Sequence, residues 1–154
     1  MTGRTGSGAR SSLSPAAGAP ETIYISGFPP DVTWWYGVLH PEDWARVLHI
    51  DDGYWLALSG GTRRPSEVLR TLVRGAMPEW LIDLGVDHRR EFRNKMHGGL
   101  QLPDVILVST PRRDKLVVLE GHARVTGWFL AGQGTRTRPA YLGTSPAMAE
   151  WGCF

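Results

Sequence analysis

The sequence contains one cysteine, no long apolar run and almost no excess of charge of either sign. Cys153 has no second cysteine to pair with, which excludes an intramolecular disulfide and a cysteine-rich zinc site. No stretch approaches the roughly 18 apolar residues of a membrane-spanning helix, and the first twenty residues lack the apolar core of a secretory signal. The formal net charge of +2 disfavours strong non-specific binding to nucleic acid. We therefore expect a cytoplasmic protein without a membrane partner.

What is present suffices for one folded domain. The chain has 154 residues, of which 42% are hydrophobic and 21% are charged, as is typical of globular domains. Residues 1–20 are rich in Gly, Ser, Ala and Pro and contain too little apolar surface to offset the entropy of ordering. We expect a disordered tail over residues 1–20 and a single domain over residues 21–154. The many Gly, Ala, Arg and Trp residues are typical of bacteria with GC-rich genomes.

Local patterns predict an α+β or α/β fold in which helices pack on a small mixed sheet. Short apolar or β-branched runs predict strands at residues 22–26, 54–58, 103–109, 116–119 and 139–142. Caps, prolines and apolar spacing predict helices from Pro41, from Pro65 or Ser66 to Gly75, and at 79–84, 89–96, 125–131 and 147–151. The clearest pattern covers residues 103–132, which read as strand, polar turn, strand, tight loop and helix.

The loop Glu-Gly-His-Ala-Arg, residues 120–124, lies where the second of these strands turns into the helix. Free main-chain N–H groups and the positive end of the helix dipole meet at such a point. Glycine allows a ligand oxygen to approach the main chain closely, and an arginine in the first turn can donate two hydrogen bonds to a phosphate. The pattern therefore favours an anion site.

The segment LVVLEGHARVTGWFLAG, residues 116–132, resembles the signature region of the ParB/sulfiredoxin-like superfamily. There a strand ends in a Gly-x-x-Arg turn, and a helix with small and aromatic residues follows. ParB carries Gly-Glu-Arg-Arg, which holds the phosphates of CTP, and sulfiredoxins carry Gly-Cys-His-Arg, which holds those of ATP. The free-serine-kinase branch carries Asp-Gly-His-x-Arg, which Gly121, His122 and Arg124 match best, with Glu120 in place of the aspartate. With the upstream LQLPDVILVS, the resemblance covers about residues 88–132.

The resemblance implies that nucleotide phosphates bind at this turn. The implied ligands are Gly121, His122, Ala123 and Arg124, and the arginines after Gly60-Gly61, Arg63 and Arg64, are further candidates. On the residues alone, each side chain also has an ordinary alternative. Arg124 can be a surface arginine, His122 can cap the helix, and the arginine pair can face solvent.

Two acids are candidates for catalysis. Glu120 is the candidate catalytic and Mg²⁺-holding carboxylate, because an acid beside bound phosphates requires a bridging cation. The alternative is a solvated glutamate at a strand end. A kinase of this branch also uses an acid after the first core strand to take the proton of the substrate hydroxyl. If residues 54–58 are that strand, the second acid is Glu67, with Glu42 as its rival.

Two departures from the superfamily narrow the expected function. His122 stands where sulfiredoxins have their cysteine, which disfavours sulfinic-acid reduction, and nothing after residue 132 resembles a helix-turn-helix, which disfavours chromosome partitioning. We expect an ATP-dependent phosphotransferase or NTP hydrolase that acts on a small hydroxylated metabolite, with ATP or CTP and Mg²⁺. The alternative is a non-catalytic nucleotide- or anion-sensing module that binds DNA or a protein partner.

Overall fold

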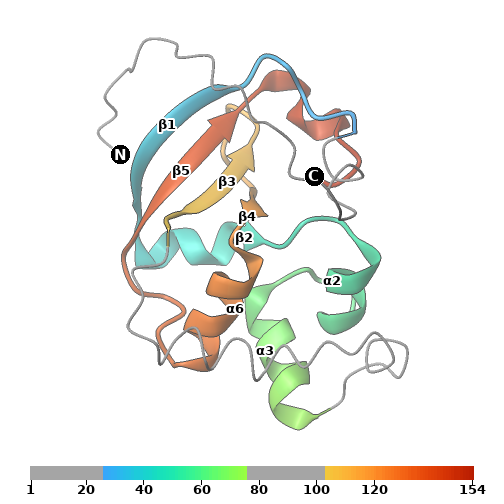
Figure 1. The fold of residues 1–154 in the computed structure, drawn as a ribbon, viewed down its shortest axis with the longest axis vertical. Helices are drawn as coiled ribbons and strands as arrows, with labels where there is room; N and C mark the ends of the chain where they lie inside the picture. The colour runs from blue at the N-terminus through green and yellow to red at the C-terminus, as the bar shows by residue number, and fades with distance from the viewer. Residues whose placement is uncertain (1–25, 76–102) are drawn as a thin grey trace.

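The structure is a computed structural model that describes residues 26–75 and 103–154. At its centre is a five-stranded mixed sheet with the strand order β1, β5, β3, β4, β2 (Figure 1). The bounds are β1 Thr33–Leu39, β2 Val47–Leu48, β3 Val105–Ser109, β4 Leu116–Glu120 and β5 Arg138–Thr144. β5 runs antiparallel to β1 and parallel to β3, whereas β4 runs antiparallel to β3 and parallel to β2.

Helices pack on this sheet, as the sequence predicts. In the described part of the chain they are η1 (Pro41–Arg46), α2 (Gly53–Leu58), α3 (Pro65–Arg74), α6 (His122–Leu130) and η2 (Pro146–Glu150), where η denotes a 3-10 helix. The fold is thus α+β, with a small mixed sheet and packed helices, and this prediction is confirmed.

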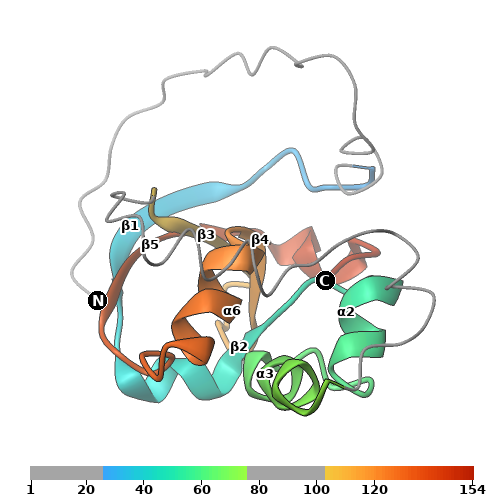
Figure 2. The same cartoon turned by 60° about the horizontal axis from the view of Figure 1, so that its bottom comes forward.

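The core is divided between the two faces of the sheet, because neighbouring residues of a strand point to opposite sides. On one face, Val108 and Val117 pack with residues of α2, α3, η2 and the last turn of the chain. This first core cluster is Ile50, Trp55, Leu58, Val68, Leu72, Val108, Val117, Met148, Trp151 and Phe154. On the other face, Leu107 and Val118 pack with Trp44 of η1 and Val125 of α6. α6 contributes to both clusters, because Ala123 and Leu130 pack against the first cluster and Val125 lies in the second. Figure 2 shows α6 beside α3.

Most local predictions for the described residues are confirmed. α3 begins at Pro65, and Gly75 ends it in the left-handed conformation. The strand–turn–strand–loop–helix pattern is present as β3, β4 and α6, although α6 begins at His122, three residues earlier than expected. β5 and η2 occupy the places of the predicted C-terminal strand and helical turn.

The strand predicted at residues 54–58 is wrong, because this segment is helix α2. The side chain of Asp52 accepts a hydrogen bond from the main-chain N–H of Tyr54 at 2.8 Å, which caps the helix N-terminus. An apolar run of this length has no clear period, so a buried helix and a buried strand look alike in sequence. The first strand is instead β1, where exposed and more buried residues alternate.

Several predictions fall where the structure is not described. These are the tail over residues 1–20, the helices at 79–84 and 89–96, and the strand at 22–26 except for Ser26, which lies in a turn.

Candidate functional site

The predicted loop forms a tight turn between β4 and α6. Gly121 has φ of 103°, in the left-handed region that favours glycine, and it is the N-cap of α6. A Cβ atom here would lie 2.8 Å from Cγ1 of Val105, so a larger residue would also collide with β3. The N–H groups of the first helical turn have no acceptor within the helix. The turn therefore presents the start of a nine-residue helix directly at the end of a sheet strand.

Hydrogen bonds from Arg124 connect this turn to the residues just before β3. Its side chain is 9% exposed, and its Nη2 donates to Oε1 of Glu120 at 2.8 Å. Its Nη1 donates to the main-chain oxygens of Pro103 and, at 3.3 Å, of Asp104. The guanidinium lies 3.2 Å from the position of a Cβ atom on Gly121. Arg124 is therefore buried over the turn, whereas the side chain of its partner Glu120 is 65% exposed.

A β-bulge determines where the Glu120 carboxylate lies. Val118 pairs with Leu107, but Glu120 pairs with Ile106, so β4 has one more residue than β3 between the two pairs. A bulge of this kind bends the strand and changes the direction of the side chain that follows. The bulge thereby places Glu120 opposite Ile106, in the same row of residues across the sheet.

A second acid, Asp104, lies beside the same arginine. Its main-chain oxygen accepts from Arg124 at 3.3 Å, and its carboxylate accepts from the hydroxyl of Tyr36 at 2.9 Å. This hydrogen bond raises the pKa of Tyr36. Asp104 and Tyr36 were not among the predicted site residues, since their meeting depends on the register of β1 across the sheet.

His122, the first residue of α6, is held by His49, which follows β2. The two Nδ1 atoms lie 2.9 Å apart, so one imidazole donates a hydrogen bond and the other accepts it. Trp55 stacks on both rings, with centroid distances of 3.9 Å to His49 and 4.9 Å to His122. Burial lowers the pKa of His122 to about 3. Burial, together with His122 and Arg63, lowers the pKa of His49 well below its usual value.

These contacts make the His122 ring part of the protein interior. Its Nε2 atom is buried and lacks a hydrogen-bond partner in the described residues. In this conformation His122 presents its main-chain N–H, and not its ring, at the start of α6. Ala123, the next residue, packs against the first core cluster.

No hydrogen bond or ion pair found in the described residues joins the other candidate residues to the turn. Arg63 is 8% exposed and donates to the main-chain oxygens of His49 and Phe154, each at 2.9 Å. Arg64 donates to the main-chain oxygen of Ala45 at 3.0 Å. Glu67 pairs with Arg70 of the same helix at 2.6 Å. Glu42 is exposed in the first turn of η1.

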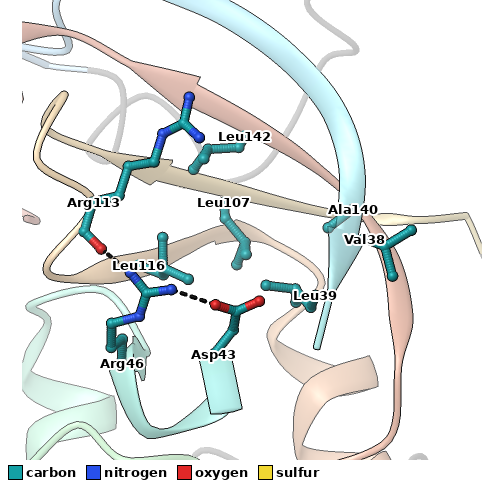
Figure 3. A pocket seen from close by; sticks show the side chains of 9 residues that line it. All are labelled: Val38, Leu39, Asp43, Arg46, Leu107, Arg113, Leu116, Ala140 and Leu142. Atoms are coloured by element: carbon teal, nitrogen blue, oxygen red, sulfur yellow. Dashed lines mark hydrogen bonds and ion pairs between the residues drawn. The ribbon is translucent and has the colours of Figure 1, made fainter. Parts of the chain in front are cut away.

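A small pocket lies elsewhere, between η1 and the sheet (Figure 3). Its floor is aliphatic, and Arg46 and Arg113 lie at its rim; the main-chain oxygen of Arg113 accepts from Arg46, whose guanidinium also pairs with Asp43. The cavity volume is about 40 Å³, well below the roughly 150 Å³ of a cavity that holds benzene. No predicted site residue lines this pocket.

The described residues thus bring together Glu120, Gly121, His122, Ala123 and Arg124, and they add Asp104 and Tyr36. They contain no group of three or more His, Cys, Asp or Glu side chains suited to a metal ion.

In residues 26–75 and 103–154, no helix has the length and apolar character needed to cross a membrane.

Comparisons with known proteins add no family to this description. No family model matches the chain, and no curated protein or solved structure shows significant similarity to it. The resemblance to the ParB/sulfiredoxin-like superfamily stays a prediction from the motif.

Proposed function

We propose that the turn between β4 and α6 binds the phosphate chain of a nucleotide, and that the protein transfers or hydrolyses the terminal phosphoryl group. The acceptor in the transfer reaction is a small hydroxylated metabolite. The observation that carries the proposal is the left-handed Gly121, which places the start of α6 and the guanidinium of Arg124 over one point.

The electrostatics of this point suit a phosphate. Unpaired N–H groups and the helix dipole together favour an anion at the N-terminus of a helix. Arg124 adds a permanent positive charge that its main-chain partners hold in position. Phosphoryl transfer relies mainly on such positioning and charge stabilisation, because the protein has little covalent chemistry to perform.

Glu120 fits one ligand position of a magnesium ion. Mg²⁺ commonly binds through one or two carboxylates together with substrate phosphates and water. One oxygen of Glu120 accepts from Arg124, yet the side chain is 65% exposed. When bound, the ion would neutralise charge that develops on the phosphate oxygens. The nucleotide and water would supply the other ligands, since the described residues form no larger metal-binding group.

Asp104 replaces Glu67 as our candidate for the second acid. Glu67 is the expected acid only if residues 54–58 form a strand, and these residues form helix α2. The main-chain oxygen of Asp104 and the carboxylate of Glu120 accept from the same arginine, Arg124. On this basis we assign the proton-accepting role to the Asp104 carboxylate, which accepts a hydrogen bond from Tyr36.

The proposal is tested by isothermal titration with ATP, ADP and CTP, each with and without Mg²⁺. We expect micromolar binding and a loss of more than about tenfold in affinity in Arg124→Ala, because a charge-assisted contact to phosphate is removed. Arg112→Ala is the matched control, since that arginine is 84% exposed in the β3–β4 turn. Unchanged affinity in folded Arg124→Ala would contradict the phosphate assignment.

Turnover is tested separately with Glu120→Gln, which keeps the shape of the side chain and removes its charge. We expect loss of nucleotide turnover, with affinity within about threefold of the wild type. Because Arg124→Ala removes a buried group, Arg124→Lys is measured beside it, and the folded state of each variant is checked by circular dichroism. Loss of binding in Glu120→Gln would contradict a catalytic role for this acid.

The second candidate function is a nucleotide- or anion-sensing module without chemistry, which acts on DNA or a protein partner. The ion pair between Glu120 and Arg124 favours it, because this pairing neutralises the carboxylate that would hold the cation. Binding without turnover, under every combination of nucleotide and Mg²⁺, would select this alternative.

A further inference from the structure

A row of side chains crosses the sheet from its edge strand to Glu120. Tyr36 of β1 pairs with Tyr141 of β5, Tyr141 pairs with Ile106 of β3, and Ile106 pairs with Glu120 of β4. Residues that pair directly across a sheet share one face, and Figure 1 shows these four strands side by side. The row therefore connects an aromatic edge of the sheet with the carboxylate at the candidate site.

The aromatic end of this row is open to solvent. Trp34, Tyr36 and Tyr141 are 47%, 50% and 45% exposed, and Val38 of the same strand is 40% exposed. Large apolar side chains that gather on one exposed surface commonly mark a binding site. Here they lie on the same sheet face whose other half is covered by α2 and α3.

These rings are held in fixed positions although they are exposed. The rings of Tyr36 and Tyr141 lie 4.8 Å apart at an interplanar angle of 52°. The hydroxyl of Tyr36 is bound to Asp104. The ring of Trp34 covers Gly143, where an added Cβ atom would come within 2.7 Å of it. A surface that is already ordered loses little conformational entropy when a ligand binds to it.

A continuous set of contacts joins this surface to the turn. Tyr36 contacts Asp104, the main chain of Asp104 contacts Arg124, and Arg124 contacts Glu120 and lies over Gly121. A ligand with an anionic group at Gly121 would thus extend past two acids toward the aromatic rings. A nucleotide has this order of groups, with phosphates, a sugar that carries hydroxyls, and a planar base.

We infer that Tyr36 and Tyr141 form a stacking platform for the base of the nucleotide whose phosphates bind at the Gly121 turn. The inference rests on the proposed function, and it assigns the open aromatic surface to the same ligand. Aromatic side chains can stack on any base, because every base has a flat π face.

The test compares ATP with inorganic triphosphate and adenosine by isothermal titration. We expect the wild type to bind ATP more tightly than triphosphate by about tenfold or more, which corresponds to stacking of one base. In the double variant Tyr36→Ala/Tyr141→Ala, the affinity for ATP should fall to that for triphosphate. The affinity for triphosphate itself should change by less than about twofold, because its site at Gly121 is intact.

Three further variants separate stacking from other effects. Tyr36→Phe keeps the ring and removes the hydroxyl, so the preference for ATP should remain. Tyr36→Leu/Tyr141→Leu keeps an apolar pair across the strands and should lose the preference as the alanine variant does. Val73→Ala is the matched control, because Val73 is an exposed apolar residue on α3.

The outcomes distinguish the inference from the proposed function. Equal affinity of the wild type for ATP and triphosphate would overturn the platform and leave the phosphate site standing. A preference for ATP that survives in both double variants would overturn it as well. If neither ATP nor triphosphate binds, the proposed function fails, and the assignment of the platform to a nucleotide fails with it.

Discussion

The two halves of one sheet face differ in what covers them. Around β3 and β4, Val108 and Val117 are fully buried beneath α2, α3 and the C-terminal turn. Around β1 and β5, Trp34, Tyr36, Val38 and Tyr141 are between 40% and 50% exposed. Both halves are rich in large apolar residues, so hydrophobic composition alone does not tell a core from a binding surface.

The difference lies in how the two halves meet the candidate site. The covered half supplies stability through buried aliphatic contacts. In the open half, the hydroxyl of Tyr36 binds Asp104. The paired row of residues connects this half to Glu120. We interpret the covered half as the support of the site and the open half as part of it.

The largest effect should come from truncation in the covered half. Leu72→Ala removes a side chain that is 1% exposed in the first core cluster. We expect a loss of about 2–5 kcal/mol in the free energy of unfolding, from lost burial and the cavity left behind. Val38→Ala in the open half should change it by less than about 0.5 kcal/mol. Urea unfolding measures both, and equal losses would show that the open half is also part of the core.

The second-largest effect should come from acid, which should lower the free energy of unfolding through two buried histidines of the covered half. His49 and His122 have pKa values lowered in the folded protein, so the unfolded chain binds more protons between pH 6.5 and about 3. The free energy of unfolding therefore falls as pH decreases below 6.5, by at most about 1.4 kcal/mol per pH unit for each histidine. Unfolding by urea at pH 7, 6 and 5 measures the slope.

Replacement of both histidines provides the control for this slope. His49→Leu/His122→Leu removes the hydrogen bond from both sides, which costs less than removal from one side. This variant should lose the dependence of stability on pH between 6.5 and 5, whereas the variant of exposed His40, His40→Asn, should retain it. A slope that persists in the double variant would assign the acid sensitivity to other groups.

The same comparison shows what the sequence could and could not predict. The pattern from residue 103 to 132 was predictable because its turns, caps and β-branched runs act over short distances. The row from Tyr36 to Glu120 was not, since it depends on strand register and on a bulge that local sequence does not reveal. The main-chain partners of Arg124 lie 20 and 21 residues away along the chain. The sequence therefore predicts a surface arginine or a phosphate ligand, and it does not reveal that this side chain is buried against the main chain before β3.

Gly121 follows β4 and caps α6, and its replacement should have a smaller effect than truncation of Leu72. In Gly121→Ala, the alanine would have to adopt φ near 103°, and its Cβ atom would lie 2.8 Å from Cγ1 of Val105. We expect a loss of about 1–3 kcal/mol in the free energy of unfolding, as is usual for a strained main-chain position. Gly53→Ala is the matched control, because nothing lies within 4 Å of its Cβ position and φ there is not left-handed. That change should be neutral or stabilising by about 0.5–1 kcal/mol, since alanine favours a helix. A Gly121→Ala protein as stable as Gly53→Ala would show that the turn can relax, and then the geometry that presents Arg124 and the start of α6 would not be fixed by this glycine.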